Sequence, residues 1–355
     1  MLGSSEEPLW TAYDVAMLDL DGVVYIGPDA VPGAPEHLDA ARGAGMKLAF
    51  VTNNASRPPD AVARHLRDLG VAAEDDDVVT SAQAAARLLA ERFPEGSPIF
   101  VIGGEGLDLA LEEQGLRPVQ DPADGPVAAV SGFHADLRWR TVIAGAILVR
   151  DGLPWVASNT DLTVPTPQGP GPGNGVLVDV VARFADRRPE VAGKPEPPLF
   201  EETVRRVGGE HPLVVGDRLD TDIEGANNSG FDSLLVMTGV TGLEELARAR
   251  AALRPTYVGA DLGSLGRAHL SPAVGGAEVR TGGWTATVEE DRLAVDGDGE
   301  ADAWWQAVAT AAWAHLDEHD QPVDVSGLRP PGSVGARAGG PATTGPHPAD
   351  EGADA

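Results

Sequence analysis

The strongest constraint on the fold is an alternation of short apolar segments with amphipathic ones, which occurs in two separate parts of the chain. Between residues 10 and 80, "VAMLDL" and "KLAFVT" are typical of strands, whereas "EHLDAARGAG" and "DAVARHLRDLG" are typical of helices. Between residues 187 and 270, "PLVVGD" and "DSLLVM" are near-continuous apolar runs, as expected of strands buried on both faces. This alternation predicts a parallel sheet covered by helices.

The stretch between the two blocks is too long to be a structureless loop. It has its own alternation, in which "SPIFVIGG" and "PVAAVSGF" indicate strands and "LDLALEEQG" and "RTVIAGAILV" indicate helices. We therefore predict an α/β fold class: a doubly wound, Rossmann-like parallel-sheet core formed by residues 10–80 and 187–270. Residues 81–186 are predicted to form an inserted α/β domain.

The character of the sequence changes after residue 275. Residues 275–327 contain a glycine-punctuated hairpin and then the helix "EADAWWQAVATAAWAHLDEH", a small α+β segment. The helix can present one apolar face, formed by Trp305, Val308, Ala312 and Trp313. Residues 328–355 are rich in Pro, Gly and Ala and are predicted to be disordered, because they bury too little surface to offset the entropy of ordering.

Composition excludes several classes of site. The chain has no cysteine, which rules out disulfides, thiol nucleophiles and zinc–thiolate centres. Its formal net charge of −29 argues against a nucleic-acid-binding surface and repels small anions at long range. A site that handles phosphate therefore needs local positive charge, most simply a divalent cation.

Two hydropathy patterns bear on localisation. No apolar run approaches the roughly 20 residues that a membrane helix needs, and the first residues, "MLGSSEEPLW", lack the apolar block of a secretory signal. We therefore expect a cytoplasmic protein without membrane insertion.

The stretch "MLDLDGVVY" places two aspartates, Asp19 and Asp21, inside an apolar strand pattern. Residues two apart on a strand point the same way, and open α/β sheets bind ligands at the carboxyl ends of their strands. Two carboxylates about 6 Å apart repel by roughly 3 kcal/mol at an effective dielectric constant of about 20. A shared proton, a lysine or a cation must offset this repulsion. The alternative is a turn aspartate in the "DG" dipeptide.

The second strand ends in "VTNN", which places Thr52, Asn53 and Asn54 at the matching edge of the sheet. A hydroxyl and backbone amides at that edge can bind phosphate oxygens. The alternative is helix capping, since threonine and asparagine are common caps.

One of only two lysines, Lys194, lies in "VAGKPEPPLF", on a predicted loop before a helix. A lysine there can direct a compact positive charge at a phosphoryl group or a carboxylate, although a solvated surface lysine is the alternative. The other lysine, Lys47, begins a predicted strand, and we assign it a structural role.

The stretch "LVVGDRLDTDIEGANNSG" places Asp217 at the end of an apolar strand, with Asp220 and Asp222 before a helix. Clustered carboxylates suit Mg²⁺, which takes oxygen ligands and commonly one or two carboxylates together with substrate phosphate. Helix capping is a credible alternative for Asp220 and Asp222, but not for Asp217.

In chain order, "DLDGVVY", "VTNN", "GKPEP" and "GDRLDTDI" resemble the four motifs of the haloacid dehalogenase superfamily. The chain is most similar to the phosphatase branch with a large α/β cap, the phosphoglycolate and 4-nitrophenyl phosphatase-like group. "ASNTDLTVPT" and "GPGNGVLVDVV" resemble the return from cap to core in that group. The resemblance covers residues 12–265 and implies that residues 81–186 are a specificity cap.

The resemblance also implies a role for each motif. Asp19 would attack phosphorus and form an aspartyl-phosphate, and Asp21 would act as the acid and then as the base. The oxygens of the phosphoryl group would be bound by Lys194, Thr52 and the amides near Asn53 and Asn54.

The resemblance further implies a Mg²⁺ cofactor. The ion would be held by the Asp19 carboxylate, the backbone carbonyl of Asp21 and Asp217, and Asp222 would orient metal-bound water. Beyond the core, His134, Arg138 and Arg140 can either contact substrate or be surface polar residues.

The expected function is therefore Mg²⁺-dependent hydrolysis of a small phosphate monoester. Residues 275–327 resemble a reduced N-acetyltransferase-like appendage on some actinobacterial phosphatases that act on glycerol 3-phosphate in phospholipid glycerol recycling, which makes that compound the preferred substrate. No glycine-rich loop suited to coenzyme A occurs near Gly297, so acetyl transfer is not expected.

Two further functions stay open: a broad-specificity phosphatase for sugar phosphates, phosphoglycolate or nucleotides, and a non-catalytic phosphoacceptor module. A dehalogenase is disfavoured, because that chemistry needs neither an acid at Asp21 nor a metal ligand at Asp217. The expected partner is a small phosphorylated metabolite, with no nucleic acid. A homodimer is an open possibility.

Overall fold

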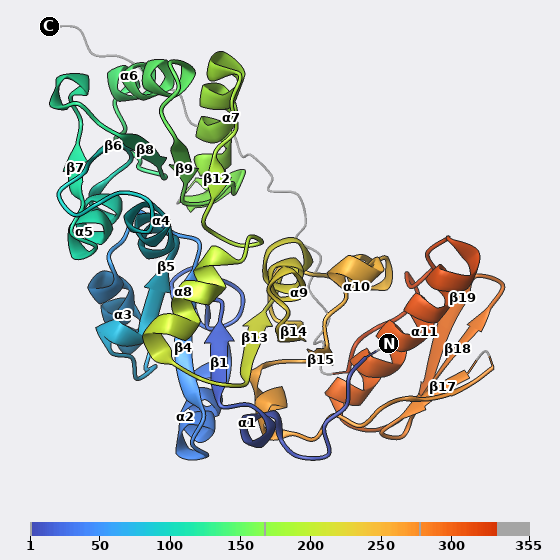
Figure 1. Ribbon diagram of the computed structural model, residues 1–355. Coiled ribbons are helices and arrows are strands. Elements are labelled where there is room, and N and C mark those ends of the chain that lie inside the picture. The colour runs from blue at the N-terminus through green and yellow to red at the C-terminus, as the bar shows by residue number, and fades with distance from the viewer. Residues whose placement is uncertain (1, 167, 277, 332–355) are drawn as a thin grey trace, which may run out of the picture.

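The computed structural model describes residues 2–331, except 167 and 277. It contains three units: a core sheet covered by helices, a cap above it, and a C-terminal α+β unit beside it (Figure 1). Most of the predicted tail lies outside the described residues. Among the helices that are described, none is both long and apolar enough to cross a membrane.

The core sheet has six parallel strands in the order β15-β14-β13-β1-β4-β5. From β1 the chain moves outward in one direction through β4 and β5, and later in the other direction through β13, β14 and β15. The strand order therefore reverses between β1 and β13, the position at which open α/β sheets bind ligands. The bounds are β1 (Val15–Leu18), β4 (Lys47–Thr52), β5 (Val78–Thr80), β13 (Pro212–Gly216), β14 (Asp232–Val236) and β15 (Tyr257–Gly259).

Both faces of the core sheet are buried, which explains the near-continuous apolar strands. Ala16 and Leu18 of β1 pack on the side covered by α1 (Leu9–Ala12), α2 (Ala34–Gly43) and α3 (Pro59–Asp68). Val15 and Met17 pack on the other side, with α4 (Ser81–Ala90), α8 (Pro198–Val207) and α9 (Glu224–Ser229).

The cap has a second parallel sheet, in the order β12-β9-β8-β6-β7. Its strands are β6 (Pro98–Ile102), β7 (Arg117–Val119), β8 (Ala128–Ser131), β9 (Trp155–Ala157) and β12 (Glu190–Val191). Because β12 belongs to this sheet, the cap continues past the expected boundary at residue 186. Helix α4 begins at the expected boundary of residue 81, where Thr80 and Gln83 form a reciprocal capping box.

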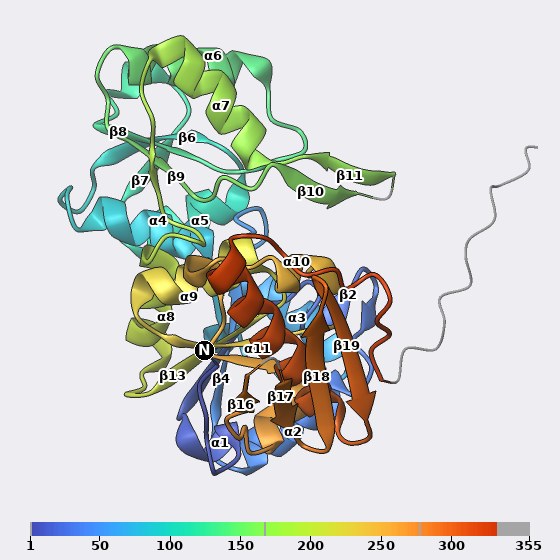
Figure 2. The same ribbon diagram turned by 90° about the vertical axis from the view of Figure 1, so that its right-hand side faces the viewer.

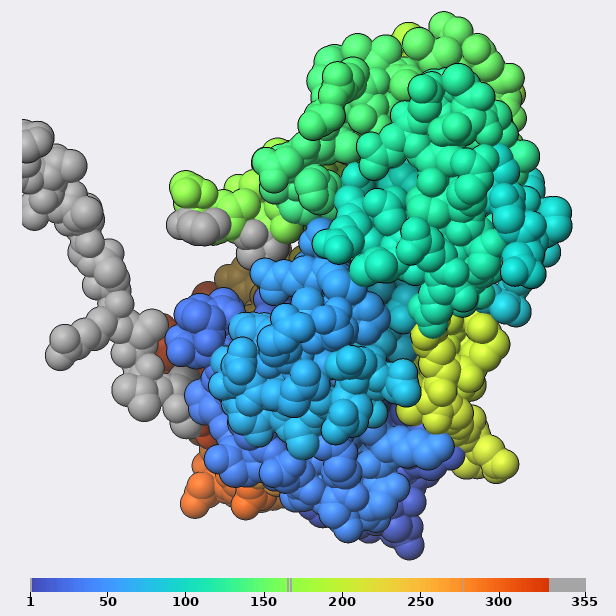
Figure 3. Space-filling model, turned by 90° about the vertical axis from the view of Figure 1, so that its left-hand side faces the viewer, coloured from blue at the N-terminus to red at the C-terminus, as the bar shows by residue number. Residues whose placement is uncertain are grey.

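Helices cover both faces of the cap sheet. Helices α4 and α5 (Glu105–Glu113) pack on the core side and share one apolar cluster with α8 of the core. Helices α6 (Trp139–Arg150) and α7 (Asn174–Ala185) cover the face away from the core (Figure 2). A hairpin of β10 (Thr163–Thr166) and β11 (Gly169–Pro172) projects from the side of the cap (Figure 3).

The C-terminal unit is an antiparallel sheet of four strands and one long helix. The strands are β16 (Ala273–Gly275), β17 (Glu278–Thr281), β18 (Trp284–Glu289) and β19 (Arg292–Gly297), and the helix is α11 (Ala301–His319). The predicted apolar face of α11 is buried. It packs in one cluster with residues of the core, including Leu219, Ile223 and Val258. The Nε1–H of Trp313 also donates to the carbonyl of Leu246 in α10 (Leu243–Ala247), at 2.8 Å.

Replacing Trp313 by alanine tests whether this unit is part of the folded core. The side chain is only 2% exposed, and removing a buried tryptophan leaves a cavity and takes one hydrogen bond from the Leu246 carbonyl. We expect the free energy of unfolding to fall by about 3–5 kcal/mol in urea denaturation. The control Val274→Ala, at an exposed position of β16, should change it by less than about 0.5 kcal/mol. Equal effects of the two substitutions would show that α11 is a loosely attached appendage.

Candidate active site

The predicted motifs meet where the strand order of the core reverses. Asp19 directly follows β1, and its backbone N–H donates to the carbonyl of Val215 in β13 at 2.9 Å. Asp217 directly follows β13, and Thr52 is the last residue of β4. Lys194 comes from the loop between the cap and α8. Four distant pieces of chain therefore converge on one edge of the sheet.

Lys194 is the only lysine at this edge, and it is buried between two carboxylates. Its Nζ donates to Oδ1 of Asp19 at 2.5 Å and to Oδ1 of Asp222 at 2.7 Å. Burial lowers the pKa of the ammonium, but the two carboxylates outweigh burial and raise the pKa above its ordinary value. The side chain therefore stays charged and holds both aspartates in place.

Asp222 lies in a wide helical turn, Leu219–Ile223, and is fully buried. Besides Lys194 it accepts, through Oδ2, the backbone N–H groups of Asp217 (3.2 Å) and Arg218 (3.1 Å). A Cβ at Gly216 would collide with this carboxylate, so the "GD" of the motif needs its glycine. Asp222 thus links the strand end to the lysine.

Asp217 has one satisfied carboxylate oxygen and one that is not. Oδ2 accepts the N–H of Val240 at 2.6 Å, whereas Oδ1 is buried and has no hydrogen-bond partner among residues 2–331 as described. Burial, followed by the charge of Asp222, raises the pKa of Asp217 to about 6. A buried, unpaired carboxylate oxygen is costly unless a cation binds it.

The site carries an excess of negative charge. One oxygen from each of Asp19, Asp217 and Asp222 lies within 4.8 Å of the others. The charge of Lys194 opposes these three carboxylates, and Arg218 adds a smaller effect on Asp217. Burial and the two neighbouring carboxylates raise the pKa of Asp19, against the effect of Lys194. Oxygen donors at this spacing and an uncompensated charge fit a hard divalent cation such as Mg²⁺.

Asp21 is exposed at the rim of the site. Enough protein nevertheless surrounds its carboxyl to raise the pKa, although the charges of Arg57, Lys194 and His65 oppose that shift. The following glycine, Gly22, has φ +87°, and a Cβ there would collide with the carboxylate of Asp217. The tight "DG" turn therefore brings Asp21 to the rim while leaving room for Asp217.

In the "VTNN" motif, the side chain of Asn53 makes contacts that the sequence did not predict. The side chain of Asn53 faces the lysine loop: its Oδ1 accepts the N–H of Lys194 at 2.8 Å, and its Nδ2 donates to the carbonyl of Lys194 at 3.0 Å and to Asp161 at 3.2 Å. The hydroxyl of Thr52 accepts the N–H of Asn54 at 3.1 Å. The side chain of Asn53 is thus engaged in holding Lys194 and the N–H of Asn54 bonds to Thr52, which leaves the hydroxyl hydrogen of Thr52 for an anion.

Sequence reasoning missed the cap residues that reach the core. Nδ2 of Asn159 donates to the backbone carbonyl of Asn53 at 2.7 Å. The carboxylate of Asp161 accepts a hydrogen bond from the side chain of Asn53. Both residues lie in "ASNTDLTVPT". This segment predicted the return of the chain from the cap to the core, but it did not predict these hydrogen bonds to Asn53. Arg57, exposed beside Asp21, was also missed, because "SRPPD" read as a helix start.

The remaining candidates lie apart from these contacts. The His134 ring packs against Gly104, where β6 and β8 of the cap end. Arg138 and Arg140 are exposed at the start of α6. Lys47 donates to the carbonyl of Val207 at 3.1 Å, which is the structural role expected of it.

Comparison with known proteins places the chain in a family. Residues 16–117 match a family model described as haloacid dehalogenase-like hydrolase, and residues 191–265 match a second, HAD-hydrolase-like model. D-glycerol 3-phosphate phosphatase of Mycobacterium tuberculosis is 42% identical over 322 residues, which are 88% of this chain and 90% of that protein. Acid sugar phosphatase of Staphylococcus aureus is 34% identical over 252 residues, which are 70% of this chain and 95% of that protein.

Solved structures agree with these relatives. The glycerol phosphate phosphatase of M. tuberculosis in complex with magnesium superposes with a TM-score of 0.80 at 40% identity, covering 89% of this chain and 94% of the other. For 4-nitrophenylphosphatase from Thermotoga maritima the TM-score is 0.67 at 32% identity, covering 73% and 98%. The predicted fold class and family are confirmed: the chain belongs to the haloacid dehalogenase-like hydrolases and is a phosphatase.

Proposed function

We propose that this phosphatase hydrolyses glycerol 3-phosphate to glycerol and phosphate, using Mg²⁺ and an aspartyl-phosphate on Asp19. The observation that carries the mechanism is the buried ammonium of Lys194 between Asp19 and Asp222, beside the unpaired oxygen of Asp217. The choice of substrate rests on the M. tuberculosis relative, which matches 88% of this chain, whereas the acid sugar phosphatase matches 70% of it.

The residues present fit a Mg²⁺ ion. The carboxylates of Asp19 and Asp217 and the backbone carbonyl of Asp21 would hold it. When bound, it would neutralise charge on the phosphoryl group and on the carboxylates around it. Asp222 already accepts three hydrogen bonds, so we assign it to positioning Lys194.

The nucleophile is the oxygen of Asp19 that does not bind Lys194. Lys194 orients the carboxylate through Oδ1, which leaves Oδ2 to attack phosphorus and form the acyl phosphate. The P–O bond to the alcohol breaks as Asp21 gives its proton to the leaving alkoxide. The raised pKa of Asp21 suits a proton donor.

The second step regenerates the enzyme. Asp21, now a carboxylate, takes a proton from water, and the resulting oxygen attacks the phosphorus of the acyl phosphate. Phosphate leaves, and the carboxylate of Asp19 is restored. Lys194, the Thr52 hydroxyl and nearby backbone amides stabilise the transferring group, because phosphoryl transfer depends chiefly on positioning and charge neutralisation.

The cap selects the substrate in this proposal. It comprises residues 81–186 with β12, and Asn159 and Asp161 join it to the "VTNN" loop beside Lys194. Closure of such a domain excludes water from the phosphoryl group.

A second candidate is a broad-specificity sugar phosphatase, which the 34% identical acid sugar phosphatase favours. A panel of glycerol 3-phosphate, phosphoglycolate, hexose phosphates and nucleoside monophosphates separates the two by kcat/KM. We expect glycerol 3-phosphate to exceed every other compound by at least about tenfold, or roughly 1.4 kcal/mol of transition-state binding. A flat profile would favour broad specificity. No phosphate release from any compound, with or without Mg²⁺, would leave a phosphoacceptor module.

The metal site can be tested without measuring turnover. A cation that binds only the folded protein stabilises it by about 2.7 kcal/mol at 100 times its Kd, so Mg²⁺ should raise the melting temperature. Asp217→Asn should abolish this rise. The control Asp220→Asn should keep it, because Asp220 is exposed and pairs with Arg218. A Mg²⁺ response that survives Asp217→Asn would place the ion elsewhere.

The role of Asn53 makes a separate prediction. Asn53→Ala removes the two hydrogen bonds that fix the lysine loop and the one to Asp161 of the cap, and a displacement of about 1 Å near the reacting atoms can reduce the rate about 100-fold. We expect kcat to fall roughly 10–100-fold, while circular dichroism stays unchanged. The control Asn228→Ala, which loses a bond to the neighbouring Pro195 carbonyl, should change kcat less than about threefold. Equal losses in both variants would refute a specific role for Asn53.

A further inference from the structure

The last turns of α11 carry two histidines outside the active site. The helix packs against the sheet of β17, β18 and β19 in the C-terminal unit (Figure 2). His315 and His319 lie near its carboxyl end, in the stretch "HLDEH". Side chains four residues apart share one face of a helix, and this is the spacing at which helical histidine pairs bind zinc.

His315 is a buried imidazole with an unpaired nitrogen. Its side chain is 7% exposed, and Nε2 is buried without a hydrogen-bond partner among the residues that the structure describes. Leaving a buried polar atom without a partner costs free energy. A ligand that binds the lone pair of Nε2 would remove that cost.

The group that faces this nitrogen is a carboxylate. Oδ1 of Asp291 lies 3.5 Å from Nε2 of His315, whereas a strong charge-assisted hydrogen bond joins two such atoms at roughly 2.7–2.9 Å. Zinc lies roughly 2.0–2.2 Å from its nitrogen and oxygen ligands, so two ligands at a tetrahedral angle are about 3.4 Å apart. The observed separation therefore fits one ion bound between the two atoms.

Backbone contacts hold Asp291 at this position. Asp291 is the second residue of a two-residue turn between β18 and β19, in which Glu290 has φ +48° and Asp291 has φ +61°. Its backbone carbonyl also accepts the N–H of Asp324 at 2.7 Å. The two facing ligands are thus placed by a helix and by a tight turn, which hold an ion more precisely than a loop does.

His319 can supply a third ligand. Its ring stacks on that of His315, with centroids 4.4 Å apart and 18° between the planes, and its Nδ1 lies 3.1 Å from the backbone carbonyl of His315. An Nδ1–H that donates to a carbonyl leaves the lone pair on Nε2, the tautomer in which histidines commonly bind metals. Because the rings are nearly parallel, His319 must turn to point this lone pair at the same ion, and its exposure permits the rotation.

We propose that His315, His319 and Asp291 bind a divalent transition-metal ion such as Zn²⁺. Two imidazole nitrogens and one carboxylate suit Zn²⁺, whereas Mg²⁺ takes oxygen ligands. The bound ion would connect the turn between β18 and β19 to the end of α11, and so stabilise the C-terminal unit. The proposal is independent of the proposed substrate and of the catalytic Mg²⁺.

Local charge favours a cation at this site. The three residues at the turn, Glu289, Glu290 and Asp291, are all acidic and exposed, and Glu318 is exposed beside His319. Negative potential raises the local concentration of cations.

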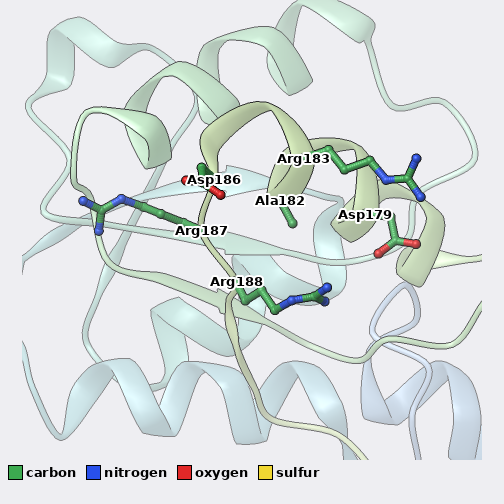
Figure 4. A pocket seen from close by; sticks show the side chains of 6 residues that line it. All are labelled: Asp179, Ala182, Arg183, Asp186, Arg187 and Arg188. Carbon is green, nitrogen blue, oxygen red and sulfur yellow. The ribbon is translucent and has the colours of Figure 1, made fainter.

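A hollow of about 460 Å³ on the cap has the opposite character. It is lined by Asp179, Ala182, Arg183, Asp186, Arg187 and Arg188. Figure 4 shows Arg183 and Arg187 extending in opposite directions from the chain. Three arginines outnumber two aspartates there, so the hollow repels a metal ion and does not compete with the site on α11.

Isothermal titration calorimetry with zinc chloride tests the proposal on the full chain. The protein is first freed of metal with a chelator and then saturated with Mg²⁺, which occupies the catalytic carboxylates. We expect one Zn²⁺ per chain, and X-ray absorption of the zinc-loaded protein should show two imidazole ligands. Zn²⁺ should also raise the melting temperature, because it binds the folded state.

Two variants change exposed ligands and so leave the fold intact: His319→Ala and Asp291→Asn. Loss of even an outer partner weakens metal sites about 10–100-fold, so each variant should raise the Kd for Zn²⁺ at least about tenfold. Their Mg²⁺-dependent phosphatase activity should match that of the wild type. The matched control His211→Ala, at an exposed histidine of the core, should leave the Kd unchanged.

Three outcomes would overturn the proposal. Failure of the Mg²⁺-saturated wild type to bind Zn²⁺ would show that the site does not exist. An unchanged Kd in both His319→Ala and Asp291→Asn would place the ion elsewhere, most simply on the catalytic carboxylates. An equal loss of affinity in His211→Ala would show that zinc binds surface histidines without selectivity.

Discussion

The site depends on the ammonium of Lys194, because this buried cation donates to both Asp19 and Asp222, with Asp217 alongside. A lysine shared by two carboxylates can hold both in fixed positions, but it cannot neutralise three. The remaining negative charge and the unpaired oxygen of Asp217 explain how a protein of net charge −29 can accept phosphate here: a divalent cation would cancel the negative charge that Lys194 leaves.

The fold supplies the geometry that this interaction requires. Because all six core strands are parallel, their carboxyl ends share one edge, and the reversal between β1 and β13 places Asp19 next to Asp217. Two further sets of contacts involve the residues at that edge. Asn53 fixes the lysine loop and connects it to Asp161 of the cap. The tryptophan-rich α11 belongs to the same apolar cluster as Leu219 and Ile223, which begin and end the turn that contains Asp222. The C-terminal unit and the turn that positions Lys194 thus share one apolar cluster.

Much of this was predictable because the signals are local. Asp19 and Asp217 interrupt apolar strands, Lys194 is one of two lysines, and strand–helix alternation fixes which ends meet. The remainder depends on tertiary packing. The side-chain contacts of Asn53 were not predicted, because its partners Lys194 and Asp161 lie more than a hundred residues away in sequence. The short β12 and the docking of α11 likewise follow from contacts between units, which periodicity within one segment does not reveal.

The central claim is that Asp19 becomes phosphorylated during turnover. Mixing the enzyme with substrate and Mg²⁺, quenching in acid within a few turnovers and measuring the mass of the peptide that contains Asp19 tests it directly. The account predicts an added phosphoryl group on that peptide, absent without substrate, and predicts that Asp19→Asn shows neither the adduct nor phosphate release while keeping its fold. Normal phosphate release by Asp19→Asn would contradict the account.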